Sequence, residues 1–143
     1  IAVYPAEAAD RISLEKAACH YWERKKRVLI VDDEQEILRI LQLNLEKLDI
    51  SIEFAQDGVE AMESIMKSVP DLIVTDITMP RMNGYELLGR LKGDARTSST
   101  PVIILTAKRV DDIQREHKEF GNIPVFEKTG DFTQITTLIS EML

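Results

Sequence analysis

The sequence predicts an α/β protein in which a five-stranded parallel sheet is covered by helices on both faces. From residue 27 onward, short apolar runs alternate with segments whose apolar residues recur at helical spacing. Three of the runs are continuously apolar or β-branched, as in strands buried on both faces. The second run alternates apolar and polar residues and the fifth contains Pro124, and both features are typical of edge strands. We therefore expect the strand order 2-1-3-4-5.

The predicted elements follow the chain in order. The strands are residues 27–31, 50–54, 71–75, 101–105 and 123–126. The helical stripes are Ile37, Leu41, Leu45 and Leu48; Ala61, Met62, Ile65 and Met66; Tyr85, Leu88 and Leu91; and Phe132, Ile135, Ile139 and Met142. A more polar stretch, residues 110–120, predicts a marginal, exposed helix, and Asp57 and Asp131 lie where N-caps are expected.

Residues 1–26 do not join this alternation and predict an N-terminal helical extension or interdomain linker before a domain at 27–143. From Glu7 to Lys26 there is no Gly or Pro, which favours one helix. Two interpretations stay open. We favour a linker or the tail of an upstream domain. The other is a helix that docks on a partner or dimerises through the short apolar stripe of Leu14, Ala18, Tyr21 and Trp22.

Charge and cysteine content restrict the classes of partner. The formal net charge is −7, and residues 27–143 hold the whole acidic excess. Nucleic acids and anionic membranes are polyanions, so we expect no direct contact with either. The single cysteine, Cys19, cannot form an internal disulfide, which favours a reducing, cytoplasmic setting. No apolar run approaches the roughly 20 residues of a membrane span.

Polar residues that could take part in binding or catalysis follow four of the predicted strands. Asp32 and Asp33 come after the first strand, Asp76 after the third, Thr106 after the fourth and Lys128 after the fifth. In sheets of this order, ligands bind outside the carboxyl ends of the strands. Each residue alone is more often structural, but together they indicate a site. Clustered carboxylates repel unless a cation joins them, and an all-oxygen ligand set favours Mg²⁺.

These residues belong to longer signatures. They are Val-Leu-Ile-Val-Asp-Asp-Glu at 28–34, Asp-Ile-Thr-Met-Pro-Arg-Met-Asn-Gly at 76–84, Thr106-Ala107 and Lys128. The intervals are 43 residues from Asp33 to Asp76, 30 from Asp76 to Thr106 and 22 from Thr106 to Lys128. With these signatures, residues 27–143 closely resemble the receiver domain of two-component response regulators. The resemblance implies the flavodoxin-like, doubly wound form of the α/β fold.

The resemblance also implies a phosphoacceptor. Asp76 would accept a phosphoryl group from a phosphohistidine on a sensor histidine kinase or a histidine phosphotransfer protein. Asp32, Asp33 and Asp76 would hold Mg²⁺, together with the backbone carbonyl of Thr78. Such a metal is needed because a carboxylate must attack an anionic phosphoryl group.

The remaining implied roles belong to Lys128 and Thr106. Lys128 would contact one phosphoryl oxygen, and Thr106 would move to hydrogen-bond another. The domain would be a signalling switch rather than an enzyme, since it would catalyse only its own phosphorylation and dephosphorylation. Flanking domains in a longer chain and a homodimer are compatible with this function.

Two departures from the receiver pattern keep an alternative open. Receivers commonly carry Tyr or Phe three residues before the lysine, where this chain has Val125, and strand alternation would aim Phe126 at the opposite face. Proline usually follows the lysine, and here Thr129 does. The alternative is a receiver-like interaction module that signals without phosphorylation-driven switching. A phosphatase or flavin-binding domain is disfavoured, because the sequence shows neither a second nucleophile nor a glycine-rich phosphate loop.

Overall fold

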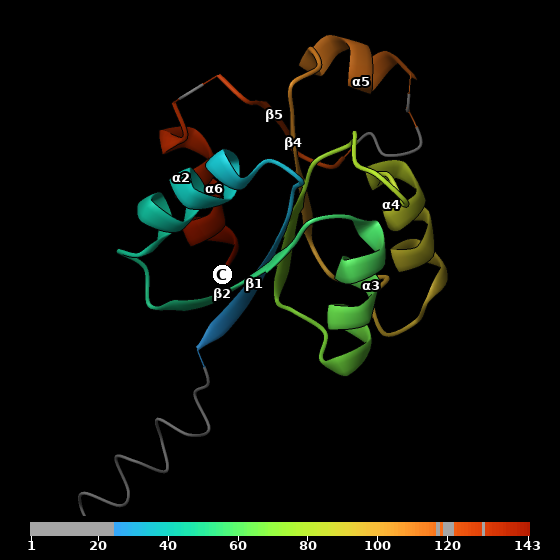
Figure 1. The fold of residues 1–143 in the computed structure, drawn as a ribbon, viewed down its shortest axis with the longest axis horizontal. Coiled ribbons are helices and arrows are strands. Elements are labelled where there is room, and N and C mark those ends of the chain that lie inside the picture. The colour runs from blue at the N-terminus through green and yellow to red at the C-terminus, as the bar shows by residue number, and fades with distance from the viewer. Residues whose placement is uncertain (1–24, 117, 119–121, 130) are drawn as a thin grey trace, which may run out of the picture.

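The five predicted strands form one parallel sheet (Figure 1). A computed structural model describes residues 25–116, 118, 122–129 and 131–143. The strands are β1 (Lys26–Val31), β2 (Ile50–Ala55), β3 (Leu72–Thr75), β4 (Val102–Thr106) and β5 (Val125–Glu127). Their order is β2-β1-β3-β4-β5, and every neighbouring pair is parallel. The predicted fold class and strand order are therefore confirmed.

Helices cover both faces of the sheet, as a doubly wound fold requires. They are α2 (Gln35–Leu45), α3 (Gly58–Lys67), α4 (Gly84–Gly93), α5 (Val110–Glu116) and α6 (Thr133–Met142). Buried residues of α2 and α6 pack against one face, and those of α3, α4 and α5 pack against the other (Figure 1). None of the helices in the described part of the chain has the length and apolarity to cross a membrane.

The core forms because successive side chains of a strand point to opposite faces. On β1, Val28 and Ile30 pack on the side of α2 and α6, whereas Leu29 and Val31 pack on the other side. The helical stripes mostly lie where the sequence predicts them. There are two exceptions: Leu48 lies beyond the end of α2 at Leu45, and Met66 is 56% exposed. It follows the buried Ile65, and one residue is about 100° around a helix, which turns Met66 toward solvent.

Several predicted element ends differ from the observed ones. Strand β5 begins at Val125, so Pro124 precedes it, and the Pro124 carbonyl accepts a hydrogen bond from Ile104 N (2.9 Å). Thr106 is the last residue of β4 rather than the residue after it. Lys26 was assigned to the end of the N-terminal helix but begins β1. Lys25, also predicted in that helix, lies in neither a helix nor a strand, and the rest of the predicted helix, up to residue 24, lies outside the described residues.

The two predicted N-caps have different outcomes. Asp57 occupies the N-cap of α3, where Oδ1 accepts a hydrogen bond from Glu60 N (2.9 Å). At α6 the N-cap position is held by Phe132, so the prediction for Asp131 was one residue off. The Asp131 carboxylate still accepts a hydrogen bond from Thr133 N (3.0 Å), the first N–H of that helix.

Candidate functional site

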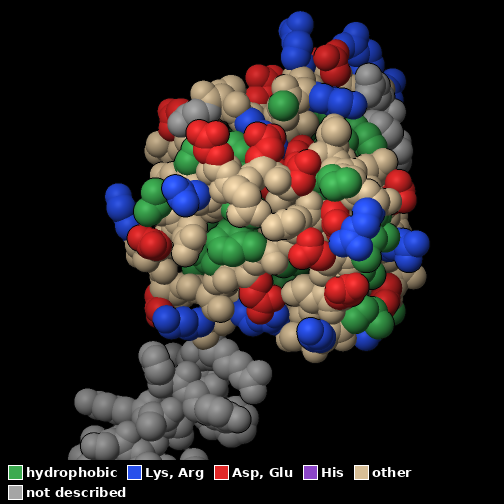
Figure 2. All heavy atoms as spheres, viewed as in Figure 1, with side chains coloured by type: hydrophobic (Ala, Val, Ile, Leu, Met, Phe, Trp, Pro, Cys, Tyr) green, Lys and Arg blue, Asp and Glu red, His purple; other side chains and the backbone are tan. Residues whose placement is uncertain are grey.

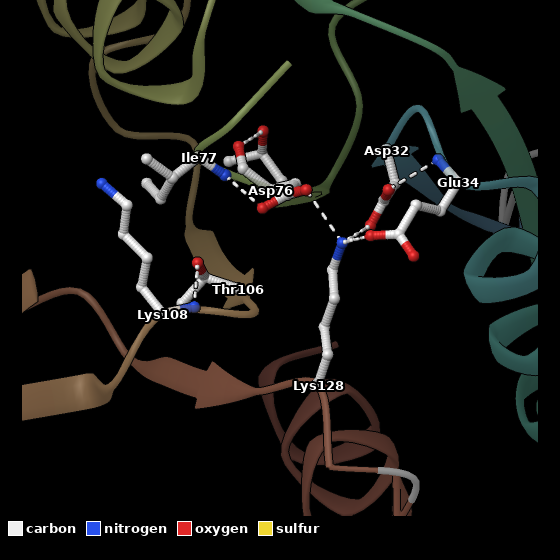
Figure 3. Close-up of polar contacts among 8 residues, drawn as sticks. Asp32, Glu34, Asp76, Ile77, Thr106, Lys108 and Lys128 are labelled. Atoms are coloured by element: carbon white, nitrogen blue, oxygen red, sulfur yellow. Dashed lines mark hydrogen bonds and ion pairs between the residues drawn. The ribbon is translucent and has the colours of Figure 1, made fainter.

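The carboxyl edge of the sheet brings the predicted site residues together (Figure 3). Asp32 directly follows β1 and Asp76 directly follows β3, and these two strands are neighbours in the sheet. Thr106 ends β4 and Lys128 directly follows β5. Because parallel strands have their carboxyl ends at the same edge, sheet order alone gathers residues that are far apart in sequence.

Lys128 lies at the centre of this group. Its Nζ is 2.8 Å from Asp32 Oδ2, 2.8 Å from Glu34 Oε1 and 2.8 Å from Asp76 Oδ2 (Figure 3). The lysine side chain is 5% exposed. Burial lowers the pKa of Lys128, but the hydrogen bonds to the three carboxylates outweigh burial and hold the pKa above its usual range. Lys128 is therefore a permanent cation within a pocket of carboxylates.

Asp32 shares that cation with two other carboxylates, and its pKa shows the result. Burial raises the pKa of Asp32 from 3.8 to about 6. Hydrogen bonds from Lys128 and from Glu34 N oppose the rise, and the negative charge of Asp76 adds to it. Desolvation therefore raises the pKa of Asp32 more than the ion pair with Lys128 lowers it, because Asp32 shares that lysine with two other carboxylates.

Asp76 is held in a fixed orientation. Its Oδ1 accepts a hydrogen bond from Ile77 N (2.6 Å), and its Oδ2 contacts Lys128. The next helix approaches so closely that a Cβ on Gly84 would lie 2.3 Å from the Asp76 carbonyl oxygen. Gly84 N also donates to Ile77 O (2.8 Å). A glycine at this position therefore lets α4 begin directly against the Asp76 backbone.

The loop between β3 and α4 is anchored to the start of α3. Arg81 has a left-handed backbone (φ 64°), and its Nε donates to Asp57 Oδ2 (2.7 Å). Gly58 N donates to Met82 O (3.1 Å). Burial raises the pKa of Asp57, but the hydrogen bonds from Arg81 and from Glu60 N outweigh burial and hold it below its usual range. These contacts fix the loop that follows Asp76.

The other predicted site residues line the same edge without joining the Lys128 contacts. Thr106 is buried, and its hydroxyl oxygen accepts a hydrogen bond from Lys108 N (3.1 Å; Figure 3). Asp33 and Thr78 are exposed. One carboxylate oxygen of Asp33 nevertheless lies within 4.8 Å of those of Asp32, Glu34 and Asp76.

This carboxylate group has the donor chemistry of a magnesium site. Oxygen ligands suit Mg²⁺, which commonly takes one or two carboxylates and keeps several waters. Some acidic side chains lie close together above the middle of the face seen in Figure 2, and others are scattered over the rest of that face. Glu34 belongs to the group but was not among the predicted site residues. The signal available in the sequence was its place in the acidic run Asp32-Asp33-Glu34.

The end of the sheet next to Lys128 shows what replaces the usual receiver residues. Val125 packs with the core on the side of α3, α4 and α5, and Phe126 packs on the opposite side, as strand alternation predicts. The described residues, Lys128 and Thr129 among them, contain no cis peptide bond. Glu127 Oε1 accepts a hydrogen bond from Val110 N (3.1 Å), the first residue of α5. Sequence reasoning had not singled out this contact.

Known proteins are similar to this chain in sequence and in fold. The chain is 39% identical over 83 residues to the alkaline phosphatase synthesis transcriptional regulatory protein PhoP of Bacillus subtilis, a match that covers 58% of this chain and 34% of that protein. Matches to the first curated relatives span only about a third of their length.

Solved structures match over most of the described fold. The chemotaxis response regulator CheY4 of Vibrio cholerae has a TM-score of 0.75 at 26% identity and covers 84% of this chain and 100% of its own. The response regulator TrrA of Thermotoga maritima, in complex with Mg(2+)-BeF, has a TM-score of 0.72 at 26% identity, over 82% of this chain and 99% of its own. The family model described as the response regulator receiver domain matches residues 28–140, and the chain therefore belongs to that family.

Proposed function

We propose that Asp76 is the phosphoacceptor of this receiver domain. The observation that carries the proposal is the contact of Asp76 Oδ2 with the buried ammonium of Lys128 (2.8 Å), while Ile77 N holds Oδ1. One carboxylate oxygen is thus oriented at the pocket beside a fixed positive charge. Such a cation offsets the repulsion between a carboxylate nucleophile and an anionic phosphoryl group.

In the proposed reaction, an Asp76 carboxylate oxygen attacks the phosphorus of a phosphohistidine. The new O–P bond forms as the P–N bond breaks, and the electron pair stays on the imidazole nitrogen, which takes a proton from solvent. Lys128 turns an N–H from the carboxylates to a phosphoryl oxygen. Thr106 rotates its hydroxyl away from Lys108 N and donates to another phosphoryl oxygen.

Asp33, Asp76 and the Thr78 carbonyl, supported by Asp32, are the residues we assign to Mg²⁺. When bound, the metal would supply positive charge that neutralises the acceptor and the incoming phosphoryl oxygens. The close spacing of the carboxylate oxygens, within 4.8 Å, supports this assignment. Without a bound cation, that spacing leaves several negative charges beside a single lysine.

The partner we propose is a sensor histidine kinase or a histidine phosphotransfer protein in the cytoplasm. We further propose that residues 27–143 act as the receiver unit and residues 1–26 as a linker to neighbouring sequence. Flanking domains and a homodimer are both compatible with this function. The receiver itself changes protein contacts rather than turning over a substrate.

The test is incubation with Mg²⁺ and a small phosphodonor such as acetyl phosphate, followed by intact mass measurement. We expect one added phosphate on the wild-type chain and none on Asp76→Asn. Asp111→Asn is the matched control, because Asp111 is an exposed aspartate of α5, away from the pocket residues, and should still gain one phosphate. A wild-type chain that binds Mg²⁺ but never gains mass would overturn the proposal.

A second candidate function is an interaction module whose contacts do not depend on phosphorylation. The packing of Val125 and Phe126 favours it. The residue three positions before Lys128 is Val125, so no aromatic ring at that position can move inward when Thr106 moves. Amide NMR spectra with and without beryllofluoride separate the candidates. Shifts confined to the pocket support the module, whereas shifts that reach α5 and β5 support the phosphorylation switch.

A further inference from the structure

Glu34 is the third carboxylate on Lys128, and nothing in the proposed reaction uses it. A lysine ammonium has three N–H donors and no acceptor. In this structure those donors face Asp32 Oδ2, Glu34 Oε1 and Asp76 Oδ2, each at 2.8 Å (Figure 3). The hydrogen-bonding capacity of Lys128 is therefore fully used before any phosphoryl group arrives.

A phosphoryl oxygen can reach Lys128 only if one of these carboxylates gives up its N–H. Asp32 and Asp76 are poor candidates, because their side chains are 2% and 6% exposed. Each is also held through its other oxygen, Asp32 by Glu34 N (2.9 Å) and Asp76 by Ile77 N (2.6 Å). Before the new O–P bond forms, separating either from Lys128 would leave a buried charge without its partner, which is costly.

The Glu34 side chain differs, since it is 54% exposed. Water can solvate its carboxylate as soon as the contact with Lys128 breaks, so release costs little. The Glu34 backbone stays in place, because it starts α2 and its N–H is bonded to Asp32. Only the side chain has to move.

We propose that Glu34 is a positioning residue that holds one N–H of Lys128 and yields it to the incoming phosphoryl group. The inference rests on the proposed function of Asp76. Glu34 keeps Nζ of Lys128 at the centre of the pocket while the site is unphosphorylated. Its carboxylate also opposes phosphorylation, because it occupies a donor that the phosphoryl oxygen needs and adds negative charge beside the acceptor.

The consequence is a measurable change in phosphorylation rate. At saturating Mg²⁺, Glu34→Gln should take up phosphate from acetyl phosphate about two- to five-fold faster than wild type, the size expected for an ion pair with one solvated partner. The affinity for beryllofluoride, a phosphoryl mimic, should rise by a similar factor. Because a variant that merely damages the pocket would lose both, a gain distinguishes positioning from a structural role.

Two further variants separate the contact from the charge. Glu34→Asp keeps the charge on a side chain one methylene shorter, which cannot span the same distance to Nζ, so its rate should lie between those of wild type and Glu34→Gln. Glu36→Gln removes the same charge from an exposed residue of the same helix turn and should leave the rate unchanged. Mg²⁺ is titrated for each variant, so that a change in metal affinity is not mistaken for a change in rate.

The outcomes are distinct. A Glu34→Gln rate at or below that of wild type overturns the role of Glu34 but leaves Asp76 as the phosphoacceptor. The same follows if Glu34→Asp behaves as wild type, because charge alone would then account for the gain. A wild-type chain that neither gains phosphate nor binds beryllofluoride overturns the proposed function, and this inference with it.

Discussion

Asp32 links the chemistry of the pocket to the stability of the fold. Its pKa is raised from 3.8 to about 6 in the folded chain, chiefly by burial. Between these two values the folded state binds a proton that the unfolded state has lost. The free energy of unfolding contributed by Asp32 is therefore greatest below pH 4, falls as the pH rises from about 4 to about 6, and is flat above that.

In Mg²⁺-free buffer we expect this fall to be on the order of 2–3 kcal/mol, at about 1.4 kcal/mol per pKa unit. Denaturant unfolding between pH 4 and pH 7 measures it as the difference between wild type and Asp32→Asn. The difference is needed because carboxylates with a lowered pKa, such as Asp57, contribute less to the free energy of unfolding as the pH falls. Parallel curves for wild type and Asp32→Asn would contradict the prediction.

Single residues also show how far the sequence could predict the site. Asp32, Asp76 and Lys128 were found because each lies just beyond the carboxyl end of a predicted strand, and strand order decides which ends meet. Glu34 was missed because its role depends on how far its side chain reaches back from the start of α2. The N–H of Ile77 was missed because backbone donors leave no mark on residue type.

Among the elements, the junction of β3 and α4 has little room for added volume. A Cβ at Gly84 would lie 2.3 Å from the Asp76 carbonyl oxygen, so the backbone of Asp76 or of α4 must shift. We expect Gly84→Ala to lower the free energy of unfolding by about 1–3 kcal/mol, as overpacking does. Phosphate uptake should fall as well, because Asp76 is displaced.

Gly89 provides the matched control on the same helix. It is exposed, and a Cβ there would meet nothing within 4 Å. Gly89→Ala should therefore raise stability by up to about 1 kcal/mol through helix propensity, with unchanged phosphate uptake. Thermal unfolding and intact mass together measure both effects. Equal stability changes in the two variants would show that the junction is not tightly packed.

The sequence predicted which strands and helices exist, and their order, better than it predicted the residues at which they begin and end. Continuous apolar runs identified the buried strands because both of their faces must be covered. The ends failed where local patterns compete with tertiary contacts. Pro124 lies before β5 rather than in it. Proline has no N–H to donate, so only its carbonyl joins the hydrogen bonds between β4 and β5, by accepting from Ile104 N. Met66 continued an apolar pattern but turned outward, because α3 covers the sheet with Ala61 and Ile65.

For the whole molecule, the concentration of carboxylates at one edge predicts a response to Mg²⁺. A ligand that binds only the folded state adds about 1.4 kcal/mol to the free energy of unfolding for each tenfold excess over its dissociation constant. We expect Mg²⁺ to raise the melting temperature of wild type at constant ionic strength. Asp33→Asn should lose most of this increase, because it removes an exposed carboxylate of the pocket.

Asp111→Asn serves as the control for charge, since it lies on α5 rather than in the acidic group. Its melting temperature should respond to Mg²⁺ as the wild type does. Differential scanning calorimetry with MgCl₂ against NaCl of equal ionic strength makes the comparison, because salt screening alone also changes acidic proteins. An equal Mg²⁺ response in Asp33→Asn and wild type would show that the metal binds elsewhere.

The position of Lys128 has a consequence for the order in which the molecule is made. Lys128 follows Glu34 by 94 residues and Asp76 by 52, so the ribosome synthesises the carboxylates long before their cation. A nascent chain that ends before β5 holds Asp76, the proposed acceptor, without the lysine that pairs with it. On the proposed function, competence to accept phosphate depends on completion of the sheet, and a stalled or truncated receiver should be unable to accept phosphate.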